Sequence, residues 1–560
     1  MEKGTKKKAL NIVLFMAACG ASIFVALFVY AKNGIPGHII DLIYSLERIE
    51  GLKDAISHGD LFASVYPRFY GGYGYGTPMF YSDVFFLPAA LLRIVGFSAT
   101  QSFKLFVALI VAAHFFTSYI SYKKMSGDRF IGLTGAVITV TSVYFIWEIV
   151  YRAGISSYIA SMFFPVLSYA LWDFFFGGKE EKCGTKTYLF TIAFLGMALS
   201  HVMSAATALV FTVLTVLISL LFKRTRKIVF SLTSIKRIVS YAVLTLGLSA
   251  FYIVPMIEQM MSGRFYYEKP LVNIGDYVVS FSSLFGVRAY TDGYDSFIGL
   301  GAALLVGILT VAILSVKNKK FGAAAVITLL GVLLSVTITD IFPWHIFNNT
   351  PVNGLQFSFR LFPVAICLIV TGFVLTLCKE AGRTKIALLT VVSLLSLVFA
   401  VVENKDVKAS ELSLSFGDEF LDTEGTYYVG MGTEWLPLEA DISSFNVTDV
   451  VSDGESFSFA RDGYNRYSFE DINGGHDAYT CPLIFYKGYK ASITTEDGTV
   501  KDLSVVRGNT GLVKIENPGK IAGIVTVSYK KTAMKVVSIA VSFVFLAAFM
   551  ICILKKKKES

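Results

Sequence analysis

Charged residues are scarce in this chain of 560 residues, since Asp, Glu, Lys and Arg make up only 16% of it. In an ordinary soluble domain about a quarter of the residues are charged. Hydrophobic residues make up 54%, and the mean hydropathy is +0.61. Apolar stretches of about 16 to 22 residues, long enough to span a bilayer as a helix, recur along the whole chain. The composition excludes a soluble globular protein and predicts a polytopic all-α membrane protein.

Cysteine is also scarce, with six residues in the whole chain and no CxxC pair. This pattern predicts neither a disulfide framework nor a zinc site. The sequence has no Walker motif, no Cys/His cluster and no Gly-x-Ser-x-Gly motif. ATP-driven transport and serine hydrolysis are therefore unsupported.

The apolar runs and the basic loops between them predict the topology. A segment at 84–97 is too short to cross comfortably and contains Pro88 and Arg93, so we expect an outer interfacial or re-entrant helix there. The run 187–222 is flanked by basic clusters, which predicts a hairpin with Ser200 and His201 at its outer tip. Both termini are then cytoplasmic. The twelve predicted transmembrane segments are 9–31, 101–121, 130–147, 156–177, 187–200, 203–222, 238–258, 296–316, 321–339, 361–378, 386–402 and 533–554.

Three regions follow from this topology. Residues 1–402 form a multispanning membrane domain whose outer loop, 32–100, holds interfacial helices. Residues 403–531 alternate short β-type runs with Gly, Asp and Asn turns, which predicts an extracellular antiparallel β-domain, arranged as a sandwich. Residues 532–560 form a final transmembrane helix and a basic cytoplasmic tail. We expect a multi-pass protein of the bacterial plasma membrane, surrounded by membrane lipids.

The net charge of +9 does not indicate a nucleic-acid partner. The segment 403–531 carries 12 Lys and Arg against 21 Asp and Glu, so its own charge is −9 and the remainder carries +18. Most of that positive charge lies in the loops and tails assigned to the cytoplasm, as the positive-inside rule requires.

The first outer loop holds the densest set of candidate residues. Asp41, Ser45 and Arg48 have helical spacing on one face. A solvated interfacial helix is the structural alternative. A loop rich in Gly and Tyr follows, whose rings suit a sugar or a lipid headgroup, although an interfacial aromatic belt would have the same composition. Its candidate substrate-binding residues are Tyr73, Tyr75 and Tyr81.

Other candidates come from distant segments that share the outer side. Glu148 and Arg152 are four residues apart and could simply pair with each other. His201 could be catalytic or only a hydrogen-bonded structural residue. Gln356 and Arg360 precede the span at 361–378. Their convergence at one bilayer depth predicts a single site.

Transfer from a lipid-linked phosphate donor fits this residue set. Arg48, Arg152 or Arg360 could bind the phosphate through bidentate contacts. Asp41 and Glu148 could deprotonate an acceptor hydroxyl, and Asp41 could instead hold a divalent cation such as Mg²⁺ or Mn²⁺.

Several motifs occur in order along the chain. They are Asp41-x-x-Tyr44-x-Leu46-x-Arg48-Ile49-x-Gly51, Gly72-Tyr-Gly-Tyr, Tyr151-Arg152-Ala153, Leu199-Ser200-His201, Leu355-Gln356-Phe-x-x-Arg360 and Gly432-x-Glu434-x-Leu436-Pro437. With these motifs the chain resembles bacterial YfhO-type membrane proteins and the group labelled as having a 6-pyruvoyl-tetrahydropterin-synthase-related domain, a label that does not indicate pterin chemistry.

The resemblance implies a GT-C-like glycosyltransferase fold, an outer active site in the first loop and a polyprenyl-phosphate sugar as donor. By position, Asp41 matches the first-loop acid and Glu148 the acid before the Arg152 motif. Two residues depart from the expected pattern: Ser45 stands where His is expected, and Ser157 stands where Glu is expected.

These observations predict a glycosyltransferase that moves a sugar from a polyprenyl-phosphate carrier to an extracellular glycan, lipid or polymer of the cell envelope. The alternative is a non-catalytic lipid-glycan flippase or envelope assembly factor. That alternative requires polar residues lining a path through the bilayer, for which His114 and Asp173 are the main candidates. A scaffold whose β-domain binds a wall polymer is a third hypothesis, for which twelve spans would be excessive.

Overall fold

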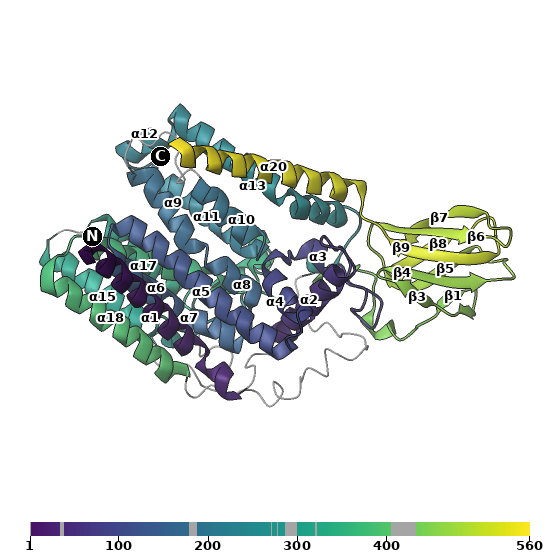
Figure 1. Cartoon of the computed structure of the whole chain (residues 1–560), viewed down its shortest axis with the longest axis horizontal. Helices are drawn as coiled ribbons and strands as arrows, with labels where there is room; N and C mark the ends of the chain where they lie inside the picture. The colour runs from purple at the N-terminus through teal and green to yellow at the C-terminus, as the bar shows by residue number, and fades with distance from the viewer. Residues whose placement is uncertain are drawn as a thin grey trace.

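A helical body and a β-domain lie end to end, and both chain termini lie at the end of the body farthest from the β-domain (Figure 1). The computed structural model describes residues 2–33, 39–177, 188–269, 272–276, 278–285, 299–319, 322–404 and 433–559. The first part of the predicted β-domain, 405–432, and Gly432 of the last motif lie outside these residues.

The helices of the body begin and end at recognisable local signals. Ser98 forms a capping box with Gln101 at the start of the long helix α5, and Gly127 ends that helix with a φ of +70°. Asp128 then caps the next helix through the backbone N–H of Phe130. The helices up to residue 219 are α1 (Glu2–Asn33), α2 (Ile39–Ser57), α3 (Thr77–Phe80), α4 (Leu87–Ile94), α5 (Ala99–Ser126), α6 (Arg129–Val140), α7 (Val143–Ile146), α8 (Ile155–Ser161), α9 (Phe164–Phe176), α10 (Leu189–Ala198) and α11 (Val202–Ser219).

The remaining helices include short 3-10 turns that carry parts of the site. They are α12 (Lys223–Val229), α13 (Leu232–Met260), α14 (Phe281–Leu284), α15 (Gly301–Lys317), α16 (Ala323–Thr337), η7 (Pro351–Leu355), η8 (Ser358–Leu361), α17 (Phe362–Leu377), α18 (Gly382–Asn404), η10 (Thr433–Trp435) and α20 (Ala533–Glu559). A π-helical turn, η2 (Trp147–Tyr151), follows α7.

Each of the twelve apolar segments predicted from the sequence contains a helix within the described residues. Eight described helices are long and apolar enough to cross a membrane, and a ninth crossing results if α6 and the helix after it, bent by 53°, count as one. Three of the predicted segments, α10, α15 and α16, are shorter apolar helices of 10 to 17 residues. The mostly helical fold is confirmed, whereas the number of crossings and their direction stay predictions.

Two local predictions are confirmed as far as the helices are concerned, while their placement on the outer side stays a prediction. The run 187–222 contains two helices, α10 and α11, that break at Leu199 to His201. The segment 84–97 forms a short helix, α4, whose Leu87, Leu91 and Ile94 are 40 to 46% exposed and lie on one face. An exposed apolar stripe of this kind suits an interfacial helix.

The most buried helix of the body is α17, of which every residue from Phe362 to Leu377 is buried. It packs against α16, α15, α6, α9 and α5. The turn η8 precedes it directly and carries Arg360. A helix packed on all sides is held rigidly, so the residues at its start have a fixed position.

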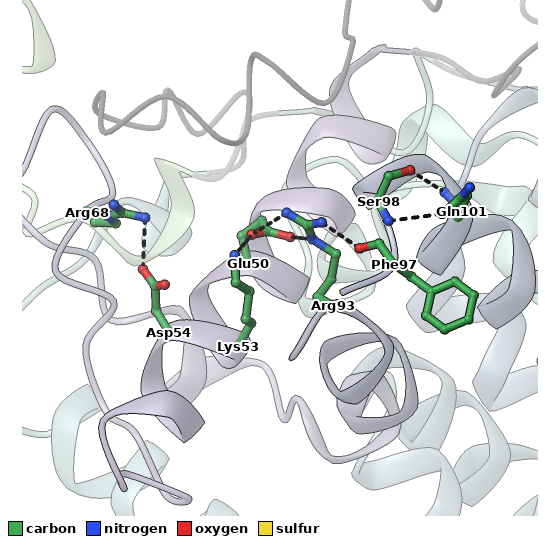
Figure 2. A network of polar contacts seen from close by, with 8 residues as sticks. All are labelled: Glu50, Lys53, Asp54, Arg68, Arg93, Phe97, Ser98 and Gln101. Carbon is green, nitrogen blue, oxygen red and sulfur yellow. Dashed lines mark hydrogen bonds and ion pairs between the residues drawn. The ribbon is translucent and has the colours of Figure 1, made fainter. Parts of the chain in front are cut away.

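Helix α2 carries Asp41 and is held by a network of ion pairs shown in Figure 2. Arg93 of α4 pairs with Glu50, which also accepts from Lys53 at 2.9 Å, and Arg93 donates to the carbonyl of Phe97 at 2.7 Å. Arg68 of the following loop lies 3.2 Å from Asp54. These contacts fix the second half of α2 against α4 and the loop, and thereby set the position of its first turn.

The β-domain is antiparallel as predicted, but its strands form one continuous sheet rather than two. The nine strands run in the order β2-β1-β5-β8-β7-β6-β9-β4-β3. The strands are β1 (Val450–Ser452), β2 (Glu455–Phe457), β3 (Ala460–Gly463), β4 (Arg466–Asp471), β5 (Ala478–Ile484), β6 (Tyr489–Thr494), β7 (Val500–Arg507), β8 (Leu512–Glu516) and β9 (Gly523–Tyr529). The sheet curls into a half-barrel around one apolar core, because β7 pairs with both β6 and β8 and so joins the two expected layers.

The β-domain is fastened to the helical body at several points. Asn465 donates to the carbonyl of Val65 at 3.0 Å, and the backbone N–H of Ile484 donates to the carbonyl of Tyr73 at 2.9 Å. Gln259, near the end of α13, exchanges two hydrogen bonds with the backbone of Lys487. After β9 the chain continues into α20, which packs along α13.

Candidate functional site

Three charged side chains form a row between α2 and the turn η2. Nε of Arg152 lies 3.1 Å from Oδ2 of Asp41, and its NH1 lies 2.9 Å from Oε1 of Glu148. The side chain of Glu148 is completely buried, whereas that of Asp41 is 38% exposed. Glu148 therefore lies at the buried end of the row. Asp41 lies at the exposed end and is the residue that can contact a substrate.

Glu148 and Arg152 pair with each other, as their spacing allowed. Oε1 of Glu148 also accepts a hydrogen bond from the hydroxyl of Ser157, while Oε2 has no hydrogen-bond partner. Ser157 stands where the family resemblance predicts Glu, and a second carboxylate there would meet Glu148 directly. Because Glu148 is enclosed, it can orient Arg152 but cannot reach a substrate.

A second arginine contacts the same aromatic ring as Arg152. The guanidinium carbon of Arg360 is 5.3 Å from the ring centroid of Phe357, and that of Arg152 is 5.8 Å from the same centroid. Arg360 donates through NH1 to the carbonyl of Leu355 at 3.1 Å, but its buried Nε has no partner. Within the described residues Arg360 forms no ion pair. Two neighbouring guanidinium groups, one of them without a counter-charge, favour an anion between them.

The backbone beside both arginines is strained. Gln356 has a φ of +64° and is the central residue of a three-residue turn, closed by the N–H of Phe357 donating to the carbonyl of Leu355 at 2.8 Å. Ala153, directly after Arg152, has a φ of +55°. Each such conformation costs about 1–3 kcal/mol for a residue other than glycine, and functional sites are where such strain gathers.

Tyr81 and Glu434 complete the wall next to Arg360. The ring of Tyr81 meets the rings of Tyr44 and Trp435 edge-on, at 6.0 and 6.1 Å. Burial, together with the charge of Glu434, raises the pKa of Tyr81 to about 12, while Arg360 acts in the opposite direction. The Tyr81 hydroxyl is therefore a neutral donor at physiological pH.

Glu434 belongs to the last motif of the sequence, but its residue type and spacing predicted no role for it. Burial, together with the charge of Asp41, raises its pKa to about 7, while Arg360 acts in the opposite direction. The adjacent Trp435 fixes its position, because this indole stacks on Phe80 with the centroids 4.3 Å apart. Glu434 follows Asp41 by 393 positions, so only folding brings the two carboxyl groups together.

His201 lies at the tip of the hairpin and caps α11. Its Nδ1 accepts from the backbone N–H of Ser204 at 3.3 Å, so the proton of the neutral ring is on Nε2. Burial and the positive charges of Arg360, Arg152 and Arg48 lower its pKa well below the usual range. The ring is thus neutral and can donate a hydrogen bond through Nε2.

Arg48 was expected to bind phosphate, but its guanidinium is closed off inside the protein. The residue is 1% exposed; Nε donates to Asp83 at 2.7 Å, NH1 donates to the hydroxyl of Ser156 at 2.8 Å, and NH2 donates to the carbonyl of Ser82 at 3.2 Å. Asp83 also accepts from Tyr66 at 2.6 Å. Nε and both Nη atoms donate hydrogen bonds, so Arg48 holds the loop in place. Its positive charge acts on the site only from a distance.

Tyr73 and Tyr75, two of the three tyrosines predicted to bind substrate, make structural contacts instead. Tyr73 donates to the carbonyl of Val447 at 2.6 Å and stacks on Phe445, with the ring centroids 4.5 Å apart. The hydroxyl of Tyr75 accepts from the backbone N–H of Trp435 at 3.2 Å. Both side chains attach the first outer loop to the segment that leads into the β-domain, which leaves Tyr81 as the tyrosine that faces the charged groups.

A divalent cation was predicted to bind at Asp41. Among the described residues no three His, Cys, Asp or Glu side chains lie close enough together to hold a metal ion. The nearest charged partner of Asp41 is the cation Arg152, at 3.1 Å. A metal here would need donors from the substrate, such as phosphate oxygens, so the cation stays a prediction.

A comparison with solved structures finds a mycobacterial enzyme. It is similar to the cryo-EM structure of arabinofuranosyltransferase AftD from Mycobacteria, with a TM-score of 0.44 and 15% identity over 71% of this chain and 27% of that one. A mutant form of the same enzyme gives a TM-score of 0.43 and 13% identity, over 71% and 28% of the two chains. The chain thus spans about a quarter of the length of these structures, and at such scores the likeness does not define an activity.

Comparison with curated proteins gives no match. A family model, by contrast, does match the sequence, and it confirms the family predicted from the motifs. The sequence profile described as "6-pyruvoyl-tetrahydropterin synthase related domain; membrane protein" matches residues 79–405, more than half of the chain, and the protein belongs to that family.

Proposed function

We propose that this protein is a membrane glycosyltransferase that moves a sugar from a polyprenyl-phosphate donor to an extracellular envelope glycan, lipid or polymer. The observation that carries the proposal is a partly exposed carboxylate, Asp41, paired with Arg152, whose guanidinium contacts the same aromatic ring as that of Arg360. The family resemblance in the sequence supports the same reaction class and a site on the extracellular side.

The reaction breaks the bond between the anomeric carbon and the phosphate oxygen and forms a bond from that carbon to the acceptor oxygen. The leaving polyprenyl phosphate gains one negative charge in this step. Arg360 and Arg152 stabilise that developing charge, which is the kind of interaction that lowers a reaction barrier. The acceptor hydroxyl loses its proton to Asp41, which then returns it to solvent.

The other residues of the site act through position. Glu148 and Ser157 hold Arg152, and the Nε2–H of His201 and the hydroxyl of Tyr81 are donors that can orient the phosphate or a sugar hydroxyl. Glu434 is the competing candidate for the base, because a carboxyl with a pKa of about 7 is half-ionised at neutral pH.

The proposal is tested by analysing envelope glycans and lipids from a deletion strain that carries wild type or Asp41→Asn. Loss of a general base lowers a rate by about 10²–10⁴-fold, so we expect the sugar modification to return with wild type and to be absent with the variant. Asp502→Asn, an exposed carboxylate of β7, is the matched control and should restore the modification fully. Full restoration by Asp41→Asn would remove that residue from the mechanism.

The non-catalytic flippase makes a different prediction for the same strains. It would tolerate Asp41→Asn but require polar residues on a path between the helices. Of its two candidates, His114 is buried edge-on against the rings of Phe145 and Tyr158, and neither ring nitrogen has a hydrogen-bond partner. Accumulation of the unmodified polymer outside the cell in the Asp41→Asn strain would favour transfer over transport.

A further inference from the structure

A groove is lined by residues of α1, α5 and α6. The start of α1 lies at the end of the helical body that holds the chain termini (Figure 1). Its volume is about 790 Å³, within the range of about 300–1,000 Å³ that is typical of small-molecule sites. The helix α2 with Asp41 lies at the opposite end, next to the β-domain (Figure 1), so the groove is separate from the proposed glycosyl-transfer site. Its lining residues are Asn11, Ile12, Leu14, Phe15, Tyr119, Lys123, Gly127, Asp128, Arg129, Phe130 and Leu133.

The charges that line the groove favour an anion. Asp128 is already neutralised, since one carboxylate oxygen accepts from the backbone N–H of Phe130 at 2.8 Å and the other pairs with Lys385. Lys123 and Arg129, by contrast, have no carboxylate partner in the described part of the chain. The ammonium of Lys123 lies 5.3 Å from the ring centroid of Tyr119, and Arg129 donates to the side chain of Asn11. Two cations are thus held at one rim without a counter-charge.

The rest of the lining is apolar and open. Ile12 of α1 is 64% exposed, and Phe130 of α6 is 42% exposed. Phe15 forms the floor, with its ring 4.9 Å from that of Tyr119. A free phosphate ion would use only the cationic rim, whereas a phospholipid would cover the apolar wall with its acyl chains and meet the rim with its phosphate. The combination of the two surfaces therefore selects a lipid over a soluble anion.

We propose that this groove binds an anionic phospholipid of the leaflet that faces the chain termini, with Lys123 and Arg129 on its phosphate and the wall of α1 and α6 along its acyl chains. Basic pockets between helices at the cytoplasmic surface suit such headgroups. The bound lipid would join α1 to the α5–α6 pair and stabilise the packing of the first helix.

The test uses the full-length protein in nanodiscs and phosphatidylglycerol as the probe, with native mass spectrometry to count retained lipids and a titration to give the affinity. The double variant Lys123→Gln/Arg129→Gln should bind about 25-fold more weakly, since each cation near an anionic lipid contributes about fivefold. Lys124→Gln removes the same charge from the adjacent exposed residue, which does not line the groove, and should bind like wild type.

Three outcomes would overturn the proposal. Equal affinity of wild type and the double variant would exclude the two cations. Equal affinity for phosphatidylcholine would exclude charge recognition, and binding of inorganic phosphate as tightly as phosphatidylglycerol would show that the apolar wall contributes nothing. If the double variant does not fold, Lys123→Gln alone answers the question, because Lys123 is exposed and its ammonium lies against the ring of Tyr119; a fivefold loss supports the site and no loss rejects it.

Discussion

Arg48 and Arg360 occupy neighbouring parts of the same end of the molecule but have opposite surroundings. Arg48 is 1% exposed and its nitrogens contact Asp83, Ser156 and a backbone carbonyl. Arg360 has one backbone carbonyl and an aromatic ring, and its Nε has no partner. In the sequence both are candidate phosphate ligands. In the described part of the structure, only the guanidinium of Arg360 has no carboxylate partner. A guanidinium whose donors are all satisfied stabilises a fold, and one whose donors are unsatisfied can bind a substrate.

The largest effect on stability is expected when Asp83, the counter-ion of Arg48, is replaced. Asp83→Asn leaves the buried Arg48 charge without its counter-ion, and breaking a buried pair in this way costs about 3–5 kcal/mol. We expect a loss of that size in the free energy of unfolding, measured by chemical denaturation in detergent. A variant as stable as wild type would mean that Arg48 is not a structural cation.

Arg360→Gln should have the reverse profile. Removing one preorganised donor to a developing negative charge lowers kcat by about 10²–10³-fold, whereas unfolding should be nearly unchanged because Arg360 forms no ion pair within the described residues. Activity is measured as sugar transfer from a polyprenyl-phosphate donor in membranes. Arg466→Gln, an exposed arginine of β4, is the control for loss of positive charge. Destabilisation by Arg360→Gln as large as that of Asp83→Asn would abolish the distinction between the two arginines.

The pH dependence of donor binding is a further test of the charge of Arg360. Because the pKa of Glu434 is raised to about 7, this carboxyl is neutral at pH 6 and anionic at pH 8. The anion offsets the charge of Arg360 and repels the donor phosphate, so the donor KM should rise as the pH rises from 6 to 8. At about 1 kcal/mol for such a partly exposed pair, the increase is about fivefold.

Glu434→Gln should make that KM profile flat while leaving kcat nearly unchanged. A kcat that instead rises through pH 7 in wild type and is lost in Glu434→Gln would assign the role of base to Glu434 in place of Asp41. The two outcomes have opposite signs and are measured in one set of assays.

The smallest predicted effect concerns the backbone next to Arg360. Gln356→Gly relieves a conformation with a φ of +64°, so we expect a gain of about 1 kcal/mol in the free energy of unfolding. Transfer activity should fall, because glycine holds the following Phe357 and Arg360 less firmly. Higher activity in the variant would show that the strained turn does not serve the site.

Much of the helical body was predictable from the sequence, because hydrophobic run length and basic flanks are local signals. The hairpin at 187–222 and the short helix α4 were predicted from these signals alone. The site was predictable only in part. The pairing of Glu148 with Arg152 follows from i, i+4 spacing, while the approach of Asp41 to Arg152 depends on the packing of distant helices.

Three residues that were predicted to bind substrate have other partners in the structure, for a physical reason. Arg48, Tyr73 and Tyr75 have side chains that could bind a substrate, and nothing local shows that Asp83, Val447 and the backbone of Trp435 occupy them. The expectation of a β-sandwich was wrong for a similar reason, because strand patterns are local, whereas the pairing of β7 with both β6 and β8 is not.

The stacking of Trp435 on Phe80 has a consequence for the order in which the protein is made. Synthesis proceeds from the N-terminus, so Asp41, Arg152 and Arg360 leave the ribosome before Glu434 and Trp435. The helices up to α18 can therefore be inserted before Glu434 and Trp435 have been made, and the wall beside Arg360 is completed last, by the segment leading into the β-domain. Asp41 stays partly exposed after that step.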